Sequence, residues 1–199
     1  LISELSGRSN VMACSPIDLR DDPEKMKAVL ARVMELEAQG YAFENAEASF
    51  DLLVRKVVGV HVPRFDLQGV RVISEFDRGG KPMSEATVKV LAGGVLHHTV
   101  SEGEHGPVNA LDQALRKALL PLYPCLRQMR LVDYRVHIVN AQAAAEAKVR
   151  VVIESAAGTE SWNTVGVSEN IIEASALALV DSLEYMLMRL APKRRARKG

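Results

Sequence analysis

The chain has 199 residues, of which 48% are hydrophobic and 25% are charged, and its 25 Lys and Arg residues balance 25 Asp and Glu residues. This composition excludes wholesale disorder, and no apolar run approaches the roughly 20 residues that a membrane helix needs. The sequence begins without Met, and its first residues have neither a basic nor an apolar stretch, so we expect them not to form a signal peptide. We expect it to be part of a longer protein.

The formal net charge of zero hides an asymmetry. Residues 193–199 carry five positive charges, and without them the chain has 20 basic and 25 acidic residues, a net charge of −5. A basic tail can bind nucleic acid or an anionic membrane. We predict instead a basic, disordered terminus, because an acidic body does not favour a polyanion. The expected partners therefore include no nucleic acid and no membrane.

Motifs for catalysis and metal binding are missing from the sequence. Cys14 and Cys125 are isolated, which indicates a reducing, cytoplasmic setting. The five histidines have no spacing typical of a zinc site. No nucleophile–base constellation, Walker loop or dinucleotide fingerprint occurs, so we predict no catalytic residue, no metal ligand and no cofactor. This favours a binding or regulatory module whose small ligand is an amino acid.

The first 62 residues have helical patterns. Asp22 followed by Pro23 is typical of a helix start, and Gly40 of a helix end. A second helical pattern runs over 43–58. We predict a small, mainly helical linker subdomain over 1–62.

From Gly69 onward the hydrophobic period changes to two, which predicts strands near 70–76, 86–90 and 95–101, followed by a helix over 108–122. The same order recurs, with strands near 134–138, 149–153 and 159–165 and a helix over 171–187. An offset of 63 superposes the two halves, with Gly103 on Gly166. This indicates a duplication.

The predicted fold class is therefore α+β: a duplicated βββα domain over 63–192, with repeats at about 69–124 and 132–191, giving two three-stranded sheets and two helices. Both turns into the repeat helices are rich in small residues, with Gly103 and Gly106 in the first and Gly166 and Ser168 in the second. Helix starts favour anions, so a carboxylate would fit there.

Three segments resemble the C-terminal part of the 2-isopropylmalate synthase and citramalate synthase family: 106–112, 131–136 and 162–175. The segments 6–10, 40–50 and 162–168 resemble the citramalate synthase branch in particular. The resemblance spans residues 3 to about 190.

The resemblance implies a parent enzyme, an acyltransferase that condenses acetyl-CoA with a 2-oxo acid in a (β/α)8 barrel holding a divalent metal. Linker subdomains follow, and then a regulatory domain of two βββα units that binds the end-product amino acid and dimerises. This chain would be the linker and regulatory region, inactive alone because the barrel is absent.

The resemblance also implies effector-binding positions. N–H groups at the helix starts and the Asn109 amide would hold the effector's carboxylate, Glu169 would meet its ammonium group, and the apolar residues would receive a branched side chain. One departure is Pro107, which lacks an N–H donor. The matching residues are Val108, Asn109, Leu131, Tyr134, Ile138, Val149, Glu169 and Ile171.

The first hypothesis is a feedback domain of citramalate synthase that binds isoleucine, in an enzyme that condenses pyruvate with acetyl-CoA. The near alternative is the leucine-sensing domain of a 2-isopropylmalate synthase. Two further alternatives are a dimerisation module without an effector and a protein with a nucleic-acid-binding tail.

Overall fold

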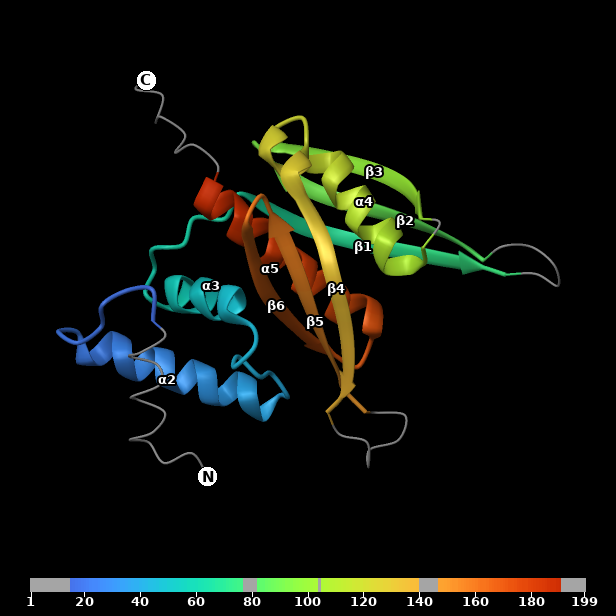
Figure 1. Ribbon diagram of the computed structural model, residues 1–199. Coiled ribbons are helices and arrows are strands. Elements are labelled where there is room, and N and C mark those ends of the chain that lie inside the picture. Colours follow the sequence, from blue (N-terminus) through green and yellow to red (C-terminus); the bar gives the residue numbers. More distant parts are fainter. Residues whose placement is uncertain (1–14, 77–81, 104, 140–146, 191–199) are drawn as a thin grey trace, which may run out of the picture. The chain divides into compact units, whose positions relative to one another are not determined.

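The computed structural model describes residues 15–76, 82–103, 105–139 and 147–190 (Figure 1). The predicted tail at 193–199, the segment 6–10 and Cys14 lie outside these residues. By their contacts the described residues form two compact units. Unit 1 combines those of 1–63 with those of 131–182, and unit 2 combines those of 64–130 with those of 183–199. The predicted domain boundaries, at residues 62 and 192, stay a prediction.

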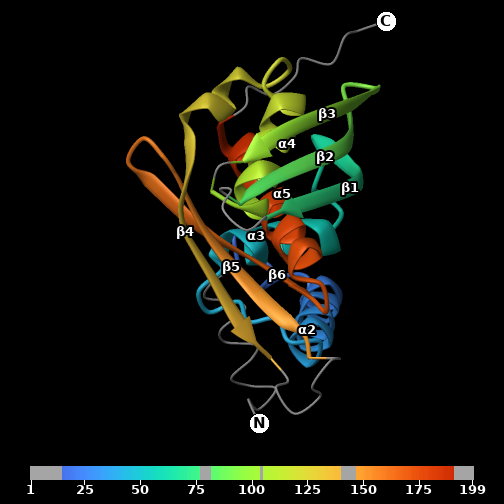
Figure 2. The same cartoon turned by 90° about the vertical axis from the view of Figure 1, so that its right-hand side faces the viewer.

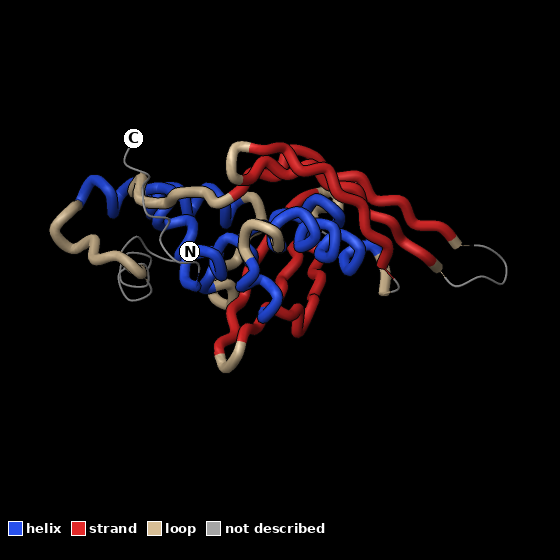
Figure 3. The backbone as a smooth tube through the Cα atoms, turned by 90° about the horizontal axis from the view of Figure 1, so that it is seen from above, coloured by secondary structure: helices blue, strands red, loops and turns tan. Residues whose placement is uncertain are grey.

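The elements confirm the predicted α+β class with two βββα repeats. The N-terminal helices are α2 (Pro23–Ala38) and α3 (Glu47–Val57). The first repeat contains β1 (Phe65–Glu75), β2 (Met83–Ala92), β3 (Val95–Gly103) and α4 (Pro107–Leu119), and a 3-10 helix, η1 (Pro124–Gln128), follows it. The second repeat contains β4 (Met129–Ile138), β5 (Val149–Ala157), β6 (Glu160–Ser168) and α5 (Ile171–Leu190). Each sheet has its three strands in chain order. Figure 3 colours the strands red and the helices blue.

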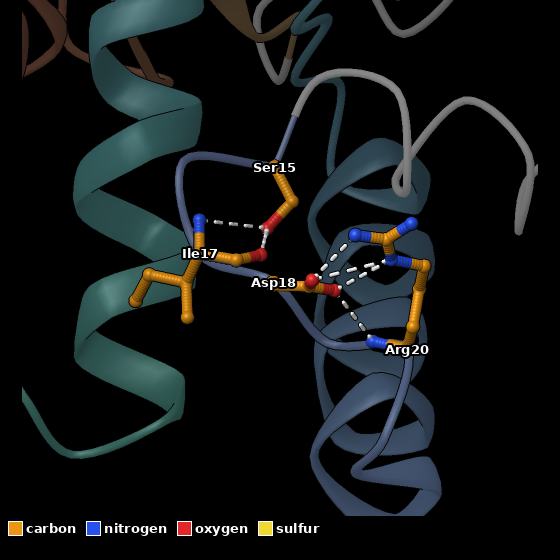
Figure 4. Close-up of polar contacts among 4 residues, drawn as sticks. All are labelled: Ser15, Ile17, Asp18 and Arg20. Atoms are coloured by element: carbon orange, nitrogen blue, oxygen red, sulfur yellow. Dashed lines mark hydrogen bonds and ion pairs between the residues drawn. The ribbon is translucent and has the colours of Figure 1, made fainter.

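Helix α2 begins and ends where the sequence predicts. The Asp22 side chain accepts a hydrogen bond from the Lys25 backbone N–H at 3.1 Å, and Pro23 is the first helical residue. Gly40 follows the helix with φ of 107°, a left-handed conformation that glycine adopts without strain. Before α2, Ser15 and Asp18 make local hydrogen bonds to Ile17 and Arg20 (Figure 4).

Helix α3 begins four residues later than the predicted start at Phe43. The Ala46 N–H donates to the Phe43 carbonyl in a turn, and the Phe43 ring stacks on the Tyr41 ring with centroids 5.9 Å apart. Both aromatic residues pack against buried residues of the second sheet. Tertiary packing therefore overrides the helical pattern over 43–46.

The two sheets differ in how they are covered. Strand β2 alternates buried and exposed side chains, as expected when one face packs on a helix. Strands β5 and β6 are buried on both faces, with α5 on one face, where the Thr164 hydroxyl bonds the Ala178 carbonyl. On the other face Val152 and Val165 pack with Ala46 of the linker. The linker therefore completes the core of the second repeat within unit 1.

Each repeat contains the same kind of hydrogen bond between a strand threonine and the repeat's helix. The Thr99 hydroxyl donates to the Ala114 carbonyl at 2.8 Å, and the Thr164 hydroxyl donates to the Ala178 carbonyl at 2.8 Å. The hairpin turns also correspond, since the two-residue loop after Ala92 begins at 93 and the loop after Ala157 begins at 158. The structural offset is thus 65 in the strands (158 − 93) and 64 in the helices (178 − 114), so the predicted single offset of 63 is wrong by one or two residues.

Candidate functional site

The eight predicted effector residues fall in both units. Val108 and Asn109, at the start of α4, belong to unit 2 and are half-buried. The other six belong to unit 1: Leu131, Tyr134, Ile138, Val149, Glu169 and Ile171. The grouping of these eight residues into one site therefore stays a prediction.

Within unit 1, Tyr134 is tied to helix α5. Its hydroxyl lies 3.0 Å from the Ser175 hydroxyl, so the Tyr134 side chain points toward the helix. Ile138 is four positions along the strand, on the same face, whereas Leu131 is three positions away, on the opposite face. Ile138 is 65% exposed and Leu131 is 36% exposed. The structure therefore groups Tyr134 with Ile138 and separates Leu131 from them.

The start of α5 is capped by its own side chains. The Asn170 amide oxygen accepts from the N–H groups of Ile172 at 2.8 Å and Glu173 at 3.4 Å. The Ser168 hydroxyl donates to the Glu173 carboxylate and accepts from the Asn170 N–H. Asn170 and Glu173 have the spacing of a capping box, a signal that our sequence analysis missed. These caps supply acceptors where the sequence analysis expected an effector carboxylate.

The start of α4 differs. Its N-cap is Gly106, with φ of 95°, and no side chain caps it. Pro107 is the first helical residue and brings no N–H donor. The Asn109 amide oxygen accepts from the Gln113 side chain at 2.9 Å. Of the two helix starts, α4 is therefore the better suited to receive a carboxylate from a ligand.

A hollow of about 390 Å³ lies beside Glu169 in unit 1. Of the predicted residues only Glu169 lines it. Lys148 brings a positive charge, and Glu169 and Glu173 bring negative charges, so the hollow offers partners for both charges of a zwitterion. The remaining lining residues are Gln39, Val167, Ser168 and Asn170.

A second hollow, of about 170 Å³, lies where the linker meets the second repeat. It is bordered by charged residues of α2, α3 and α5 and by the aromatic pair of the linker. Burial raises the pKa of Tyr41, and a hydrogen bond from the Val167 backbone N–H opposes that rise. The lining residues are Arg32, Leu36, Tyr41, Phe43, Ser49, Leu53, Lys56, Val165, Leu177 and Asp181.

The linker also closes the open edge of the second sheet. β6 is an edge strand, and its Asn163 N–H donates to the Glu47 carboxylate at 2.8 Å. Its Val165 N–H donates to the Ser49 hydroxyl at 3.0 Å. Helix α3 lies beside β6 in Figures 1 and 2. This contact could not be predicted from the sequence, because no local pattern pairs residues 116 positions apart.

No group of three or more potential metal ligands gathers in the ranges described above. In the same ranges, none of the helices combines the length and the apolar character needed to cross a bilayer.

Comparison with known proteins identifies the domain. The family model described as LeuA allosteric (dimerisation) domain matches residues 44–187. The chain is 47% identical over 192 residues to the (R)-citramalate synthase of Geobacter sulfurreducens and 46% identical to that of Aquifex aeolicus. It is 32% identical over 125 residues to the 2-isopropylmalate synthase of Aquifex aeolicus.

The coverage of these matches is uneven. The citramalate synthase matches cover 94% of this chain but only 36% of each relative. The 2-isopropylmalate synthase match covers 62% of this chain and 22% of that protein. The chain thus spans about a third of the length of the citramalate synthases it matches, and the resemblance seen in its sequence is confirmed. It belongs to the family of LeuA allosteric (dimerisation) domains.

Proposed function

We propose that this chain is the allosteric and dimerisation region of a citramalate synthase and that it binds a branched-chain amino acid. The observation that carries the proposal is the family match over 44–187, which includes both sheets. Identity of 47% to a citramalate synthase over almost the whole chain supports this branch. Isoleucine is the proposed effector.

The chemistry of the two units supports an amino-acid ligand. Unit 2 offers the uncapped start of α4, whose N–H groups and positive dipole end suit a carboxylate. Unit 1 offers Glu169 as a partner for an ammonium group and Tyr134 and Ile138 on one face of β4. The predicted effector residues keep their proposed roles.

The proposed homodimer has support on β4. This edge strand exposes four aliphatic side chains, Leu131, Val132, Val136 and Ile138, each at least 36% exposed. Exposed apolar residues on an open edge favour a protein partner. A second copy is the partner that the family description indicates.

For the parent protein we propose a Claisen-type condensation of pyruvate with acetyl-CoA, giving citramalate and CoA. The acyltransferase chemistry, the divalent metal and the acetyl-CoA site would belong to a barrel outside this chain. The 199-residue chain alone is then inactive. Its cytoplasmic location is part of the same proposal.

Two alternatives stay open. The match to a 2-isopropylmalate synthase over 125 residues favours leucine as the second candidate effector. A dimerisation module without an effector is the third. Sedimentation equilibrium with a thermal melt, with and without each amino acid, separates them. A dimer that isoleucine stabilises more than leucine supports the proposal. A dimer that neither amino acid stabilises supports a dimerisation module without an effector.

A further inference from the structure

The edge of β6 is closed by side chains instead of a strand. Two alternate residues of β6 direct backbone N–H groups to linker side chains, at Asn163 and Val165. Their acceptors are the Glu47 carboxylate and the Ser49 hydroxyl. Edge strands usually leave such donors to solvent or to another chain. Here linker side chains accept from both of these N–H groups, so a shift of the linker would change the hydrogen bonding of the β6 edge.

Helix α5 joins this contact through Asp181. The Ser49 hydroxyl donates to the Asp181 carboxylate at 2.8 Å while accepting from the Val165 N–H. The Lys56 ammonium donates to the other carboxylate oxygen at 3.0 Å. Ser49 is 3% exposed. One buried hydroxyl therefore links α3, β6 and α5.

The start of α5 carries two of the proposed effector residues, Glu169 just before the helix and Ile171 as its first residue. Asp181 lies ten residues after Ile171 in one continuous helix, about 15 Å along the axis. A helix of this length moves as a rigid element, so a shift at its start changes the position of Asp181. The hollow of about 170 Å³ beside Ser49, Lys56 and Asp181 leaves space for such a shift.

We propose that Ser49, with Asp181 and Lys56, is a coupling node that transmits effector occupancy at the start of α5 to the linker. This inference rests on the proposed function. When the effector moves α5, the hydrogen bond between the Ser49 hydroxyl and the Asp181 carboxylate changes. The hydrogen bond from the Val165 N–H to Ser49 then strengthens or weakens. By reciprocity, removing the node changes the affinity of the effector.

A purely structural role for Ser49 makes a different prediction. If Ser49 only stabilised unit 1, the amides at the β6 edge would exchange at the same rate with and without effector. Its removal would lower stability and leave effector affinity unchanged. Exchange rates of single amides, measured in both ligand states, therefore separate coupling from stabilisation.

The test is amide hydrogen exchange of the 199-residue chain by NMR, without ligand and with saturating isoleucine. Coupling predicts that isoleucine changes exchange at the amides of Asn163 and Val165 by about ten-fold. In Ser49→Ala the isoleucine-dependent change at Val165 disappears, and the Kd for isoleucine shifts at least three-fold. Ser161→Ala, the same change at an exposed serine of β6, leaves both readouts as in the wild type.

Lys56→Met is the second variant in case Ser49→Ala does not fold. Lys56 is half exposed, and its loss leaves the bond between Ser49 and Val165 in place. A reduced isoleucine response at Val165 in this variant also supports the node. Isoleucine binding with unchanged edge amides in the wild type overturns the coupling and leaves the proposed function standing. If leucine alone binds, the same experiment is run with leucine. Failure of both amino acids to bind overturns both proposals.

Discussion

The Ser49 hydroxyl and the Asp181 carboxylate meet at 2.8 Å although 132 residues separate them in the chain. Ser49 also accepts from the Val165 N–H, so the linker, the second sheet and helix α5 meet at one side chain. The linker is therefore part of the folded core of unit 1. We expect its loss or disruption to affect the second repeat directly.

Ser49→Ala tests how much this contact stabilises the fold. The change removes a hydrogen bond to a charged group and leaves the Val165 N–H without its acceptor, so we expect unfolding free energy to fall by about 2–4 kcal/mol. Urea denaturation measures the change. Ser161→Ala serves as the control and should stay within about 0.5 kcal/mol of the wild type. Equal stability of the two variants would contradict this role for Ser49.

Gly166→Ala tests the packing of α5 on β6. A Cβ atom at Gly166 would lie 2.1 Å from the Ala174 carbonyl oxygen and 2.9 Å from the Ala178 nitrogen. Backbone cannot yield as a flexible side chain does, so we expect a loss of about 3 kcal/mol or more. Gly69→Ala is the control, because its Cβ would meet only Lys89 at 3.8 Å. Equal melting temperatures for Gly166→Ala and Gly69→Ala would contradict the close approach of α5 to Gly166.

Glu184 tests the attachment of α5 within unit 2. Its buried carboxylate accepts from the backbone N–H groups of Arg64 at 2.8 Å and Phe65 at 3.1 Å, where β1 begins. Glu184→Ala leaves both donors unsatisfied, and we expect a loss of about 2–5 kcal/mol. Glu184→Gln keeps an acceptor oxygen and should lose less. A lower denaturation midpoint for Glu184→Gln than for Glu184→Ala would contradict this role of the Glu184 carboxylate.

Tyr41 gives the unfolding free energy a dependence on pH. Burial raises the pKa of Tyr41 above its ordinary value of 10.0, so the unfolded chain loses this proton at lower pH than the folded chain. The contribution is complete below pH 10 and is lost as pH rises toward the folded-state pKa. Tyr41→Phe should therefore lose stability less steeply than the wild type above pH 10. Parallel slopes for the two proteins, measured by urea denaturation, would exclude the effect.

Much of the fold could be predicted because its signals are local. Asp22, Pro23 and Gly40 mark the bounds of α2, and a period of two marks the strands. The offset of 63 was wrong for a physical reason. A shift of two residues keeps every strand side chain on its face, so hydrophobic alternation cannot separate 63 from 65. The bonds of Thr99 to α4 and of Thr164 to α5 fix the correspondence at 65 in the strands and 64 in the helices.

The candidate site was less accessible from sequence. The cap at Asn170 follows a recognisable spacing and could have been predicted. The contacts of Glu47 and Ser49 with β6 join residues 116 positions apart, and no periodicity encodes them. The late start of α3 has the same origin, since Phe43 packs on a sheet more than 100 residues away.

Isothermal titration calorimetry of the 199-residue chain with isoleucine and with leucine measures whether the chain binds a branched-chain amino acid. We expect saturable binding that is tighter for isoleucine, and weaker isoleucine binding by Glu169→Gln because the partner of the ammonium group loses its charge. Tighter leucine binding would contradict the choice of effector. No saturable heat with either amino acid would contradict the proposed amino-acid binding itself.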